Sequence, residues 1–538
     1  MTPIVTSQDA AEAKYAIEQA MLDDQEWNIL TGENSLAKVS RKNCELSVEW
    51  GKLIFAWWNG EHSQSWRVTG YTVENAELFL QVTRGMGREI STLTLRHETR
   101  WREKTEFENL EISERRRIYA QLLSHLLAAQ CGCARPPSMT TGADSRHSTP
   151  GKYARTALKR GGETILAIGA CEAESQAELD GVIAAGLVWL ANFNAQRETK
   201  QQLRQKAGRL WFCLPSRHSK SLAQTAMERL TLLDTSHLDA RMECFEVDER
   251  REAMMPVQLA AQDELLNAHP RELKWPEAEP PENPWRERIL RLAHGLIEVR
   301  RIAERESYAI NGLEFARFSG SESPRVKFGV AGVREEHDAT TLTELSEANF
   351  HRLELLVREI AEHRSADTRD RRHPFYRLRE EAWLESLLRQ NLRALDAAFD
   401  DRFVYSQIPA WRGDERSVID LLTVRYEAGQ APRLAVIEIK ASEDPQLPLQ
   451  GLDYWLRVEQ ARLRGEFERR GLFSGIRLAD QSPLLYLVAP RLRFHRTFAI
   501  VARCLSPQIE AYQVGVNANW RAGVRVRSFE RVNPPPLE

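Results

Sequence analysis

Two short apolar stretches near the carboxy-terminal end of the chain constrain its fold most. Residues 417–424 and 434–440 are rich in aliphatic and β-branched side chains, and a turn-forming segment with Gly and Pro separates them. Such runs predict strands, and the short connection predicts that the two strands pair as a hairpin. The first strand carries Asp420, and the second carries Glu438 and Lys440.

The charged residues of the second strand share one face. Because side chains alternate along a strand, Glu438 and Lys440 point to one side and Ile437 and Ile439 to the other. A Glu-x-Lys pair by itself is most simply an exposed salt bridge, because buried charges are costly unless they are paired or bound to metal. The acid on the neighbouring strand, Asp420, and the surrounding apolar residues favour a functional site instead.

This pattern resembles the PD-(D/E)xK nuclease superfamily, in its RecB-type and mismatch-endonuclease branches, over about residues 373–515. The superfamily has an acid, a spacer and Glu-x-Lys on the next strand. Some of its branches add a helix with Gln-x-x-x-Tyr, which Gln450 and Tyr454 match here. Ile419 precedes Asp420 where the name-giving proline would stand, a departure that many branches share. The resemblance implies a metal-dependent nuclease, most simply a DNA endonuclease in repair or defence.

An amphipathic helix is predicted upstream, over residues 379–395, from the spacing of its apolar residues. Glu381 and Glu385 lie one helical turn apart on a common side of this helix. The superfamily often places a glutamate of this first helix in the metal site. The resemblance therefore implies Glu385 as a ligand, with Glu381 as the alternative.

Phosphodiester hydrolysis needs an attacking water, neutralised phosphate charge and a stabilised leaving oxygen, which a hard divalent cation on oxygen ligands can supply. The resemblance implies Mg²⁺ or Mn²⁺, with Lys440 beside the metal-bound water. Lys440 would orient that water or, with a lowered pKa, accept a proton from it, and the sequence leaves both roles open. The expected catalytic set is Glu385, Asp420, Glu438, Lys440, Gln450 and Tyr454, with Asp420, Glu438, the Ile439 carbonyl and Glu385 as metal ligands.

Two arginine-rich segments flank this region. Residues 369–379 mix arginines with aromatics, a composition suited to phosphate contact and base stacking, and residues 491–496 follow a predicted strand over 483–490. Substrates of open α/β sheets bind beyond strand ends, so both segments are candidate nucleic-acid contacts. An ordinary solvated surface is an equally weighted alternative for both. The candidate contacts are Arg371, Arg372, Arg377, Arg491 and Arg493.

The chain also shows traces of an internal repeat, with three matching regions separated by about 260 to 270 residues. Residues 53–63 match 313–323, and the strand–helix–strand run from 165 to 215 parallels the run from 434 to 490. Chance similarity between short α/β segments is the alternative. The repeat places Gln121 opposite Glu385, Arg155 opposite Asp420, Ala170 opposite Glu438 and Glu172 opposite Lys440.

In this alignment the first copy lacks the acid pair, and its basic segment 151–160 suggests a lobe that holds a phosphate backbone electrostatically. The predicted fold is α/β (α+β), a restriction-endonuclease-like mixed sheet flanked by helices, in tandem duplication with β-rich accessory portions. The predicted parts are a helical and β-rich accessory domain at 1–112, a degenerate nuclease-like domain at 113–250, a Pro-rich linker at 251–287, a helix-plus-β accessory domain at 288–370 and the nuclease domain at 371–538. The five tryptophans between Trp27 and Trp66 are expected in a core.

Composition limits the remaining possibilities. A net charge of −3 argues against a polycation that coats nucleic acid, so contacts with DNA must come from local patches. Seven cysteines give no disulfide framework, and neither a signal sequence nor a membrane-spanning segment is recognisable, so a cytoplasmic protein is expected. The expected partner is nucleic acid, with a homodimer or a protein partner left open. The alternative function is a non-catalytic nucleic-acid-binding or scaffold protein built on nuclease-like lobes.

Overall fold

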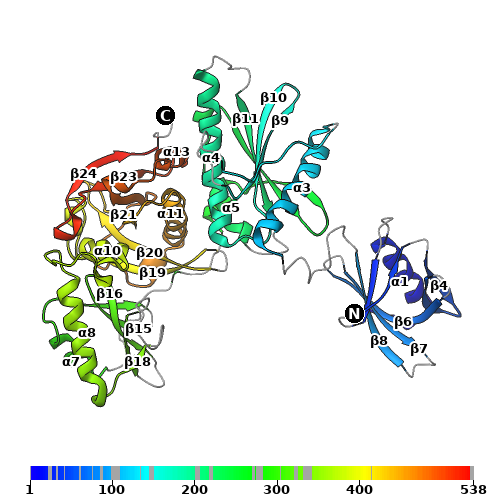
Figure 1. The fold of residues 1–538 in the computed structure, drawn as a ribbon, viewed down its shortest axis with the longest axis horizontal. Coiled ribbons are helices and arrows are strands. Elements are labelled where there is room, and N and C mark those ends of the chain that lie inside the picture. The colour runs from blue at the N-terminus through cyan, green and yellow to red at the C-terminus, as the bar shows by residue number, and fades with distance from the viewer. Residues whose placement is uncertain are drawn as a thin grey trace. The chain divides into compact units, whose positions relative to one another are not determined.

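The chain forms two compact units in the computed structural model, one of Met1–Arg115 with Arg250–Ala253 and the other of Arg116–Glu249 with Met254–Glu538 (Figure 1). The structure describes residues 2–21, 27–31, 34–40, 43–59, 62–74, 77–84, 89–97, 110–133, 135–143, 151–199, 206–216, 222–268, 273, 283–302, 305–319, 325–330, 342–412 and 415–533. Most of the proline-rich part of the predicted linker lies outside these residues, as do Gly60 and Gly320 of the sequence repeat.

The first unit is an antiparallel sheet with one helix against it. Its elements are β1 (Thr2–Pro3), α1 (Ser7–Ala20), β2 (Trp27–Thr31), β3 (Asn34–Val39), β4 (Cys44–Glu49), β5 (Lys52–Asn59), β6 (His62–Glu74), β7 (Glu77–Arg84) and β8 (Glu89–His97). The strand order is β3-β2-β8-β7-β6-β5-β4, with β1 paired to β6. The core prediction is right for Trp27 and Trp57 and wrong for Trp50, which is 98% exposed because it occupies the turn between β4 and β5.

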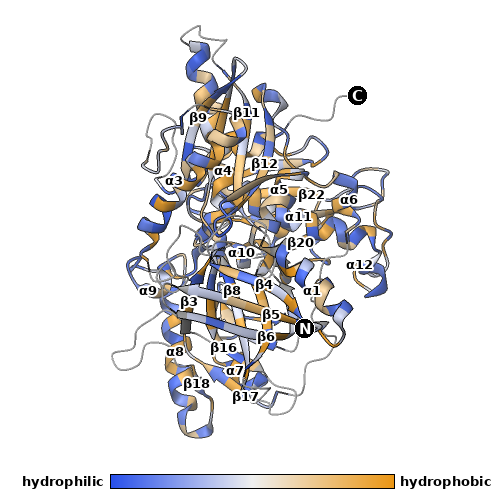
Figure 2. Ribbon diagram, turned by 90° about the vertical axis from the view of Figure 1, so that its right-hand side faces the viewer, coloured by the Kyte–Doolittle hydropathy of each residue, from blue (hydrophilic) through white to orange (hydrophobic). Residues whose placement is uncertain are grey.

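The second unit begins with an α/β lobe, called the first lobe below. Its elements are α3 (Ile112–Cys131), β9 (Ala154–Arg160), β10 (Glu163–Gly169), α4 (Gln176–Thr199), β11 (Ala207–Pro215), α5 (Leu222–Thr231), η2 (Ser236–Leu238), β12 (Arg241–Asp248), β13 (Ala253–Val257) and α6 (Gln262–Leu266). The sheet order is β13-β12-β11-β10-β9. Figure 2 shows α4 and β11 largely in hydrophobic colours, as expected of elements that are buried on most sides.

An antiparallel meander follows, called the accessory sheet below. Its elements are α7 (Arg286–Arg291), β14 (Ile297–Ile302), β15 (Arg305–Ile310), β16 (Leu313–Ser319), β17 (Arg325–Phe328), β18 (Thr343–Glu344), η3 (Glu347–Asn349) and α8 (Phe350–His363). The strands pair in chain order, and α8 supplies Leu353, Val357 and Ile360 to the core on this sheet. The apolar spacing of these three residues, four and three apart, gives α8 one buried face.

The chain ends in a second α/β lobe, called the second lobe below. Its elements are α9 (Pro374–Arg377), α10 (Glu380–Gln390), η4 (Leu392–Ala394), β19 (Tyr405–Arg412), β20 (Glu415–Arg425), β21 (Arg433–Ile439), α11 (Leu447–Leu463), α12 (Glu466–Arg469), β22 (Leu484–Pro490), η5 (Arg491–Arg493), α13 (Phe498–Arg503), β23 (Ala511–Val516), η6 (Trp520–Ala522) and β24 (Val526–Arg531). The sheet order is β19 to β24 in sequence. The helix predicted over 379–395 is shorter than expected, because Asn391 takes an extended conformation and ends α10.

The two lobes share one topology. An antiparallel hairpin, β9–β10 in the first lobe and β20–β21 in the second, is followed by two parallel pairings, β10–β11–β12 and β21–β22–β23. The crossover helices correspond as well, α4 to α11 and α5 to α13. Both sheets are therefore mixed and flanked by helices in the same order, which agrees with the repeat seen in the sequence.

The lobes also pack on each other through equivalent elements. Leu187 of α4, Leu456 of α11 and Val501 of α13 belong to one buried cluster that spans both sheets. Leu233, which follows α5, forms an isolated antiparallel bridge with Leu505, which follows α13. Because equivalent positions of the two lobes meet each other, this contact has the form of an isologous, two-fold interface within one chain.

No helix among the described residues combines the length and the apolar character that a membrane crossing requires.

Candidate functional site

The β20–β21 hairpin brings two acids together. Leu421 lies opposite Ile437 in this hairpin, which sets Asp420 beside Glu438, and each acid shifts the pKa of the other. Asp420 Oδ2 also accepts a hydrogen bond from the backbone N–H of Ile439, at 2.9 Å. The backbone of Ile439, whose carbonyl is an expected metal ligand, therefore lies next to Asp420.

Lys440 follows β21 directly and completes this group. Its Nζ lies 3.0 Å from Glu438 Oε1 and 3.8 Å from Glu381 Oε2 on α10. Burial by itself would lower the Lys440 pKa, but the carboxyl groups of Glu438, Glu381 and Asp420 outweigh it and raise that pKa. Lys440 is thus a fixed ammonium group here, which favours the water-orienting role over the proton-accepting one.

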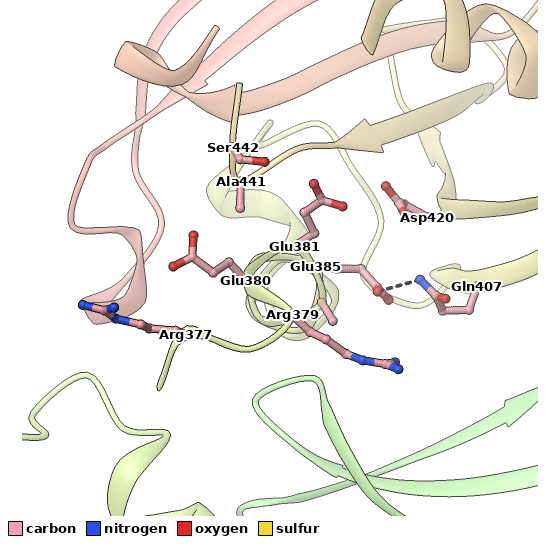
Figure 3. A pocket seen from close by; sticks show the side chains of 10 residues that line it. Arg377, Arg379, Glu380, Glu381, Glu385, Gln407, Asp420, Ala441 and Ser442 are labelled. Carbon is pink, nitrogen blue, oxygen red and sulfur yellow. Dashed lines mark hydrogen bonds between the residues drawn. The ribbon is translucent and has the colours of Figure 1, made fainter. Parts of the chain in front are cut away.

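Glu385 reaches the same point from α10, and its side chain is 2% exposed. Its Oε2 accepts a hydrogen bond from Gln407 Nε2 of β19 at 2.7 Å and lies 3.4 Å from Arg300 Nη1 of β14 (Figure 3). Burial raises the pKa of Glu385 to about 7, helped by the nearby charge of Asp420 and opposed by Arg300.

The carboxyl groups at this point are strongly perturbed by their surroundings. Burial raises the pKa of Asp420 to about 6. Burial and the neighbouring Asp420 raise that of Glu438 further above its usual range. Glu385 Oε1 and Glu438 Oε2 are buried and have no hydrogen-bond partner among the described residues, which is costly for carboxylate oxygens unless something else binds them. These residues therefore fit a divalent cation on oxygen ligands, although no ready-made group of three or more ligand side chains exists within the described ranges.

A cavity of about 550 Å³ opens beside these groups. Figure 3 shows Glu381 and Glu385 on α10 facing it from one side and Asp420 and Gln407 from the neighbouring strands. Its cations are Arg377 and Arg379. Arg379 is exposed, and its side chain makes no hydrogen bond or ion pair with the part of the chain that the structure describes.

The helix motif lies on α11 behind the hairpin. Tyr454 is close enough to Glu438 and Asp420 that burial and these acids raise the pKa of its hydroxyl. Gln450 precedes it by one helical turn and is half-buried, and no hydrogen bond joins its side chain to the acids in the described residues. The structure thus brings Tyr454 to the site and gives Gln450 no contact there.

The five arginines named as candidate nucleic-acid contacts are all exposed. Arg377 is the one that lines the cavity. Arg491 and Arg493 form the short helix η5 at the end of β22, the edge of the sheet where the hairpin acids also lie. Arg371 and Arg372 lie in the turn before α9.

The first lobe has no corresponding acids. Backbone register puts Arg155 at the position of Asp420, since Arg155 pairs with Ile168 as Asp420 faces Glu438. Ala170 N–H bonds to the Cys213 carbonyl as Lys440 N–H bonds to that of Val488. The register therefore assigns Ile168 and Ala170 to the positions of Glu438 and Lys440, two residues earlier than the sequence alignment placed them.

The phosphate-binding role predicted for the basic segment 151–160 stays a prediction. The Arg155 side chain of this segment is 3% exposed and donates a hydrogen bond to the Gly142 carbonyl. The other basic residues of the segment are exposed, namely Lys152, Lys159 and Arg160. Nearby, Arg116 binds Glu174 through two hydrogen bonds, at 2.7 and 2.8 Å. At the position of Asp420 the first lobe thus has a buried arginine that binds a backbone carbonyl.

Two residues at the site carry no signal in the sequence. Gln407 and Arg300 lie outside the acid–Glu-x-Lys pattern and outside the arginine-rich segments, and Arg300 comes from the accessory sheet, about eighty residues before Glu385. Their positions depend on tertiary packing, so neither spacing nor periodicity could reveal them.

Comparison with known proteins adds little to this geometry. A scan of protein-family models and a search of curated proteins give no match. A solved structure of EndoMS in its apo form matches with a TM-score of 0.14 and 10% identity, over 46% of this chain and 98% of that chain. At that TM-score the similarity supports no conclusion about this chain.

Proposed function

We propose that this protein is a metal-dependent phosphodiesterase of the PD-(D/E)xK type that acts on DNA, as an endonuclease in repair or defence. The observation that carries the proposal is the meeting of Asp420, Glu438 and Lys440 at one edge of a mixed sheet, with Glu385 opposite and a cavity beside them. The shared topology of the two lobes supports a tandem duplication in which the first copy lost its acids.

The chain's own groups have separate tasks in this reaction. A bound Mg²⁺ or Mn²⁺ would activate a water molecule and neutralise charge on the phosphate. Asp420 and Glu438 would hold the cation, and Glu385 would add a ligand from the helix side. Lys440, kept protonated by its acidic neighbours, would orient the attacking water and offset the developing negative charge.

The substrate backbone would enter through the cavity. Among the described residues no acid pairs with the Arg379 guanidinium group on the cavity wall, and Arg377 lies at the same wall. Phosphate oxygens are natural partners for such groups, which bind them through paired N–H donors. The exposed arginines of η5 would add contacts further along the backbone.

A cleavage assay tests the proposal. Supercoiled plasmid and labelled oligonucleotide duplexes are incubated with Mg²⁺ or Mn²⁺ and with wild type, Glu438→Ala or Lys440→Ala. Asp396→Asn is the matched control, because Asp396 is an acid of the same lobe bound to Arg425 at the far end of β20. The proposal expects cleavage by wild type and by the control, and a loss of at least a hundredfold in both site variants.

The alternative is a non-catalytic nucleic-acid-binding or scaffold protein. It predicts DNA binding without cleavage, equal in wild type and in Glu438→Ala. A product that forms equally with all four proteins would also reject the assigned site, because it would come from a contaminating nuclease or from other residues.

A further inference from the structure

Gln407 occupies an unusual place in the sheet. Its φ is +55°, a left-handed conformation that costs free energy for any residue other than glycine. Trp50, Asp239, Glu252, Asn311, Arg379 and Phe473 share this feature among the described non-glycine residues. Those six lie in turns or at helix ends, whereas Gln407 lies inside a strand, β19.

The strands around Gln407 are interrupted at the same point. Ser406 pairs with Leu421 and Ile408 with Ile419, so Gln407 stands opposite Asp420, and neither takes part in the pairing. Beside Asp420 the alternation of faces also breaks, because Ile419 and Leu422 pack into one core and Leu421 into the other. Irregularities of this kind redirect side chains, and they are common next to functional sites.

The redirected side chain has one partner in the site. Gln407 Nε2 donates a hydrogen bond of 2.7 Å to Glu385 Oε2 and so fixes one oxygen of that carboxyl group. The other oxygen, Oε1, is buried and has no hydrogen-bond partner in the described part of the chain. Figure 3 shows this bond at the cavity wall, with Asp420 on the neighbouring strand.

A second support comes from the accessory sheet. Arg300 of β14 lies 3.4 Å from the same Glu385 oxygen. Glu298 on the same strand accepts a hydrogen bond from Arg389 of α10 at 2.6 Å and also binds Ser386. Helix α10 is thereby fixed against the accessory sheet, so the position of Glu385 depends on a segment outside the predicted nuclease domain.

We propose that Gln407 is a positioning residue, held in a strained strand conformation so that its amide orients the Glu385 carboxyl group toward the cation site. This inference rests on the proposed function, because it assigns Glu385 to a cation. Groups that orient metal ligands from behind change metal affinity by about 10- to 100-fold when they are removed. The strain would be retained because a relaxed strand would direct the amide elsewhere.

Mn²⁺ affinity, measured by titration calorimetry on the full chain, tests this role without depending on cleavage. Gln407→Asn is the informative variant, because asparagine tolerates a positive φ better than glutamine, but its amide is one methylene too short to reach Glu385. Gln407→Gly removes both the strain and the amide. Gln430→Asn, the same change in the exposed turn at the other end of the hairpin, is the matched control.

The inference expects Mn²⁺ affinity to fall about 10- to 100-fold in Gln407→Asn and Gln407→Gly and to stay at the wild-type value in Gln430→Asn. The melting temperature of the metal-free Asn and Gly variants should equal or exceed that of wild type. Wild-type affinity in Gln407→Asn, when Glu385→Gln lowers it, would overturn the positioning role alone. Unchanged affinity in Glu385→Gln as well would reject the place of Glu385 in the proposed function.

Discussion

Glu438 is buried and Asp420 is half-buried beside it, and among the described residues Lys440 is a cation that lies next to them. Burial raises the pKa of both acids, so keeping them charged costs the fold free energy. A bound divalent cation would remove that cost. Removing one acid should also stabilise the metal-free fold, but it should weaken cation binding. Such a conflict between stability and function is typical of functional sites.

Asp420→Asn should raise the melting temperature of the metal-free protein at pH 8 by about 1 °C or more. The amide oxygen can still accept the Ile439 N–H, whereas the repulsion with Glu438 disappears. A gain of about 1 kcal/mol or more is expected, the equivalent of roughly one unit of pKa. Thermal denaturation with and without Mn²⁺ measures it. Mn²⁺ should stabilise wild type and leave the variant unchanged, and equal stabilisation of both would contradict the assignment.

The same acids predict how stability depends on pH. The pKa of Asp420 is raised from 3.8 to about 6 by burial, so the folded state keeps a proton that the unfolded chain has already released. Stability from this group is therefore lost as pH rises from about 4 to about 6. Denaturant titrations of the metal-free protein at pH 5 and pH 7.5 should show a larger loss for wild type than for Asp420→Asn. Parallel losses in the two proteins would count against the raised pKa.

Much of the site could be predicted from residues alone, because its acids follow one another on adjacent strands. The hairpin from 417 to 440 needs only aliphatic runs and a turn, and period-2 alternation then places Glu438 with Lys440. Gln407 and Arg300 could not be predicted in this way. The interruption of β19 at Gln407 and the contact of Arg300 with Glu385, about eighty residues later in the chain, leave no local pattern in the sequence. The burial of Arg155 could not be predicted either, because a basic residue in a sequence says nothing about whether its side chain is buried.

At the scale of elements, α4 and α11 are held together by a buried arginine. Arg229 of α5 donates two hydrogen bonds to Asp453 of α11, at 2.9 and 2.6 Å, and lies 3.2 Å from Asp180 of α4. All three side chains are almost fully buried. Removing one partner of such a group leaves uncompensated buried charge, whereas replacing the whole group by apolar residues is much less costly.

Arg229→Met should destabilise the second unit by about 3 to 5 kcal/mol, because two buried acids lose their common cation. Adding Asp180→Leu and Asp453→Leu to this variant should restore most of the lost stability. Urea denaturation of the full chain measures both changes. A single variant as stable as wild type would show that the three side chains do not form the network described, and a triple variant no better than the single one would show that charge is not the cause.

Element boundaries show what sequence patterns miss. The strand from 484 to 490 and the helix that carries Gln450 and Tyr454 occur as predicted, since each is long and uniform in character. The helix predicted over 379–395 stops at Gln390, because Asn391 leaves the helical conformation although apolar spacing continues beyond it. Periodicity detects the helix but not the local backbone choice that ends it.

At the scale of the whole molecule, the two lobes of the second unit resemble a dimer made from one chain. Leu233 and Leu505 meet at equivalent positions, as the two copies of a residue do on a two-fold axis. The second lobe has Asp420, Glu438 and Lys440, and the first has Arg155, Ile168 and Ala170 at those positions. Under the proposed function, a pair of lobes with one such centre would attack one strand at a time.

Under the proposed function, the protein is therefore expected to nick DNA. Supercoiled plasmid should convert first to open circles, with linear DNA appearing only later, as separate nicks on opposite strands accumulate. Agarose gels of a time course at low enzyme concentration measure this order. Linear DNA that forms together with the open circles from the earliest times would contradict a single centre per active particle, because it would mean that two centres act in concert.

The proposed function requires a cation held between the two strands of the hairpin. Anomalous diffraction from crystals of the full chain grown with Mn²⁺ tests it directly. The predicted result is a peak about 2 to 2.5 Å from carboxylate oxygens of both Asp420 and Glu438, absent from crystals of Asp420→Asn. A map with no peak there, or with the same peak in the variant, would contradict the claim that these acids form a metal site.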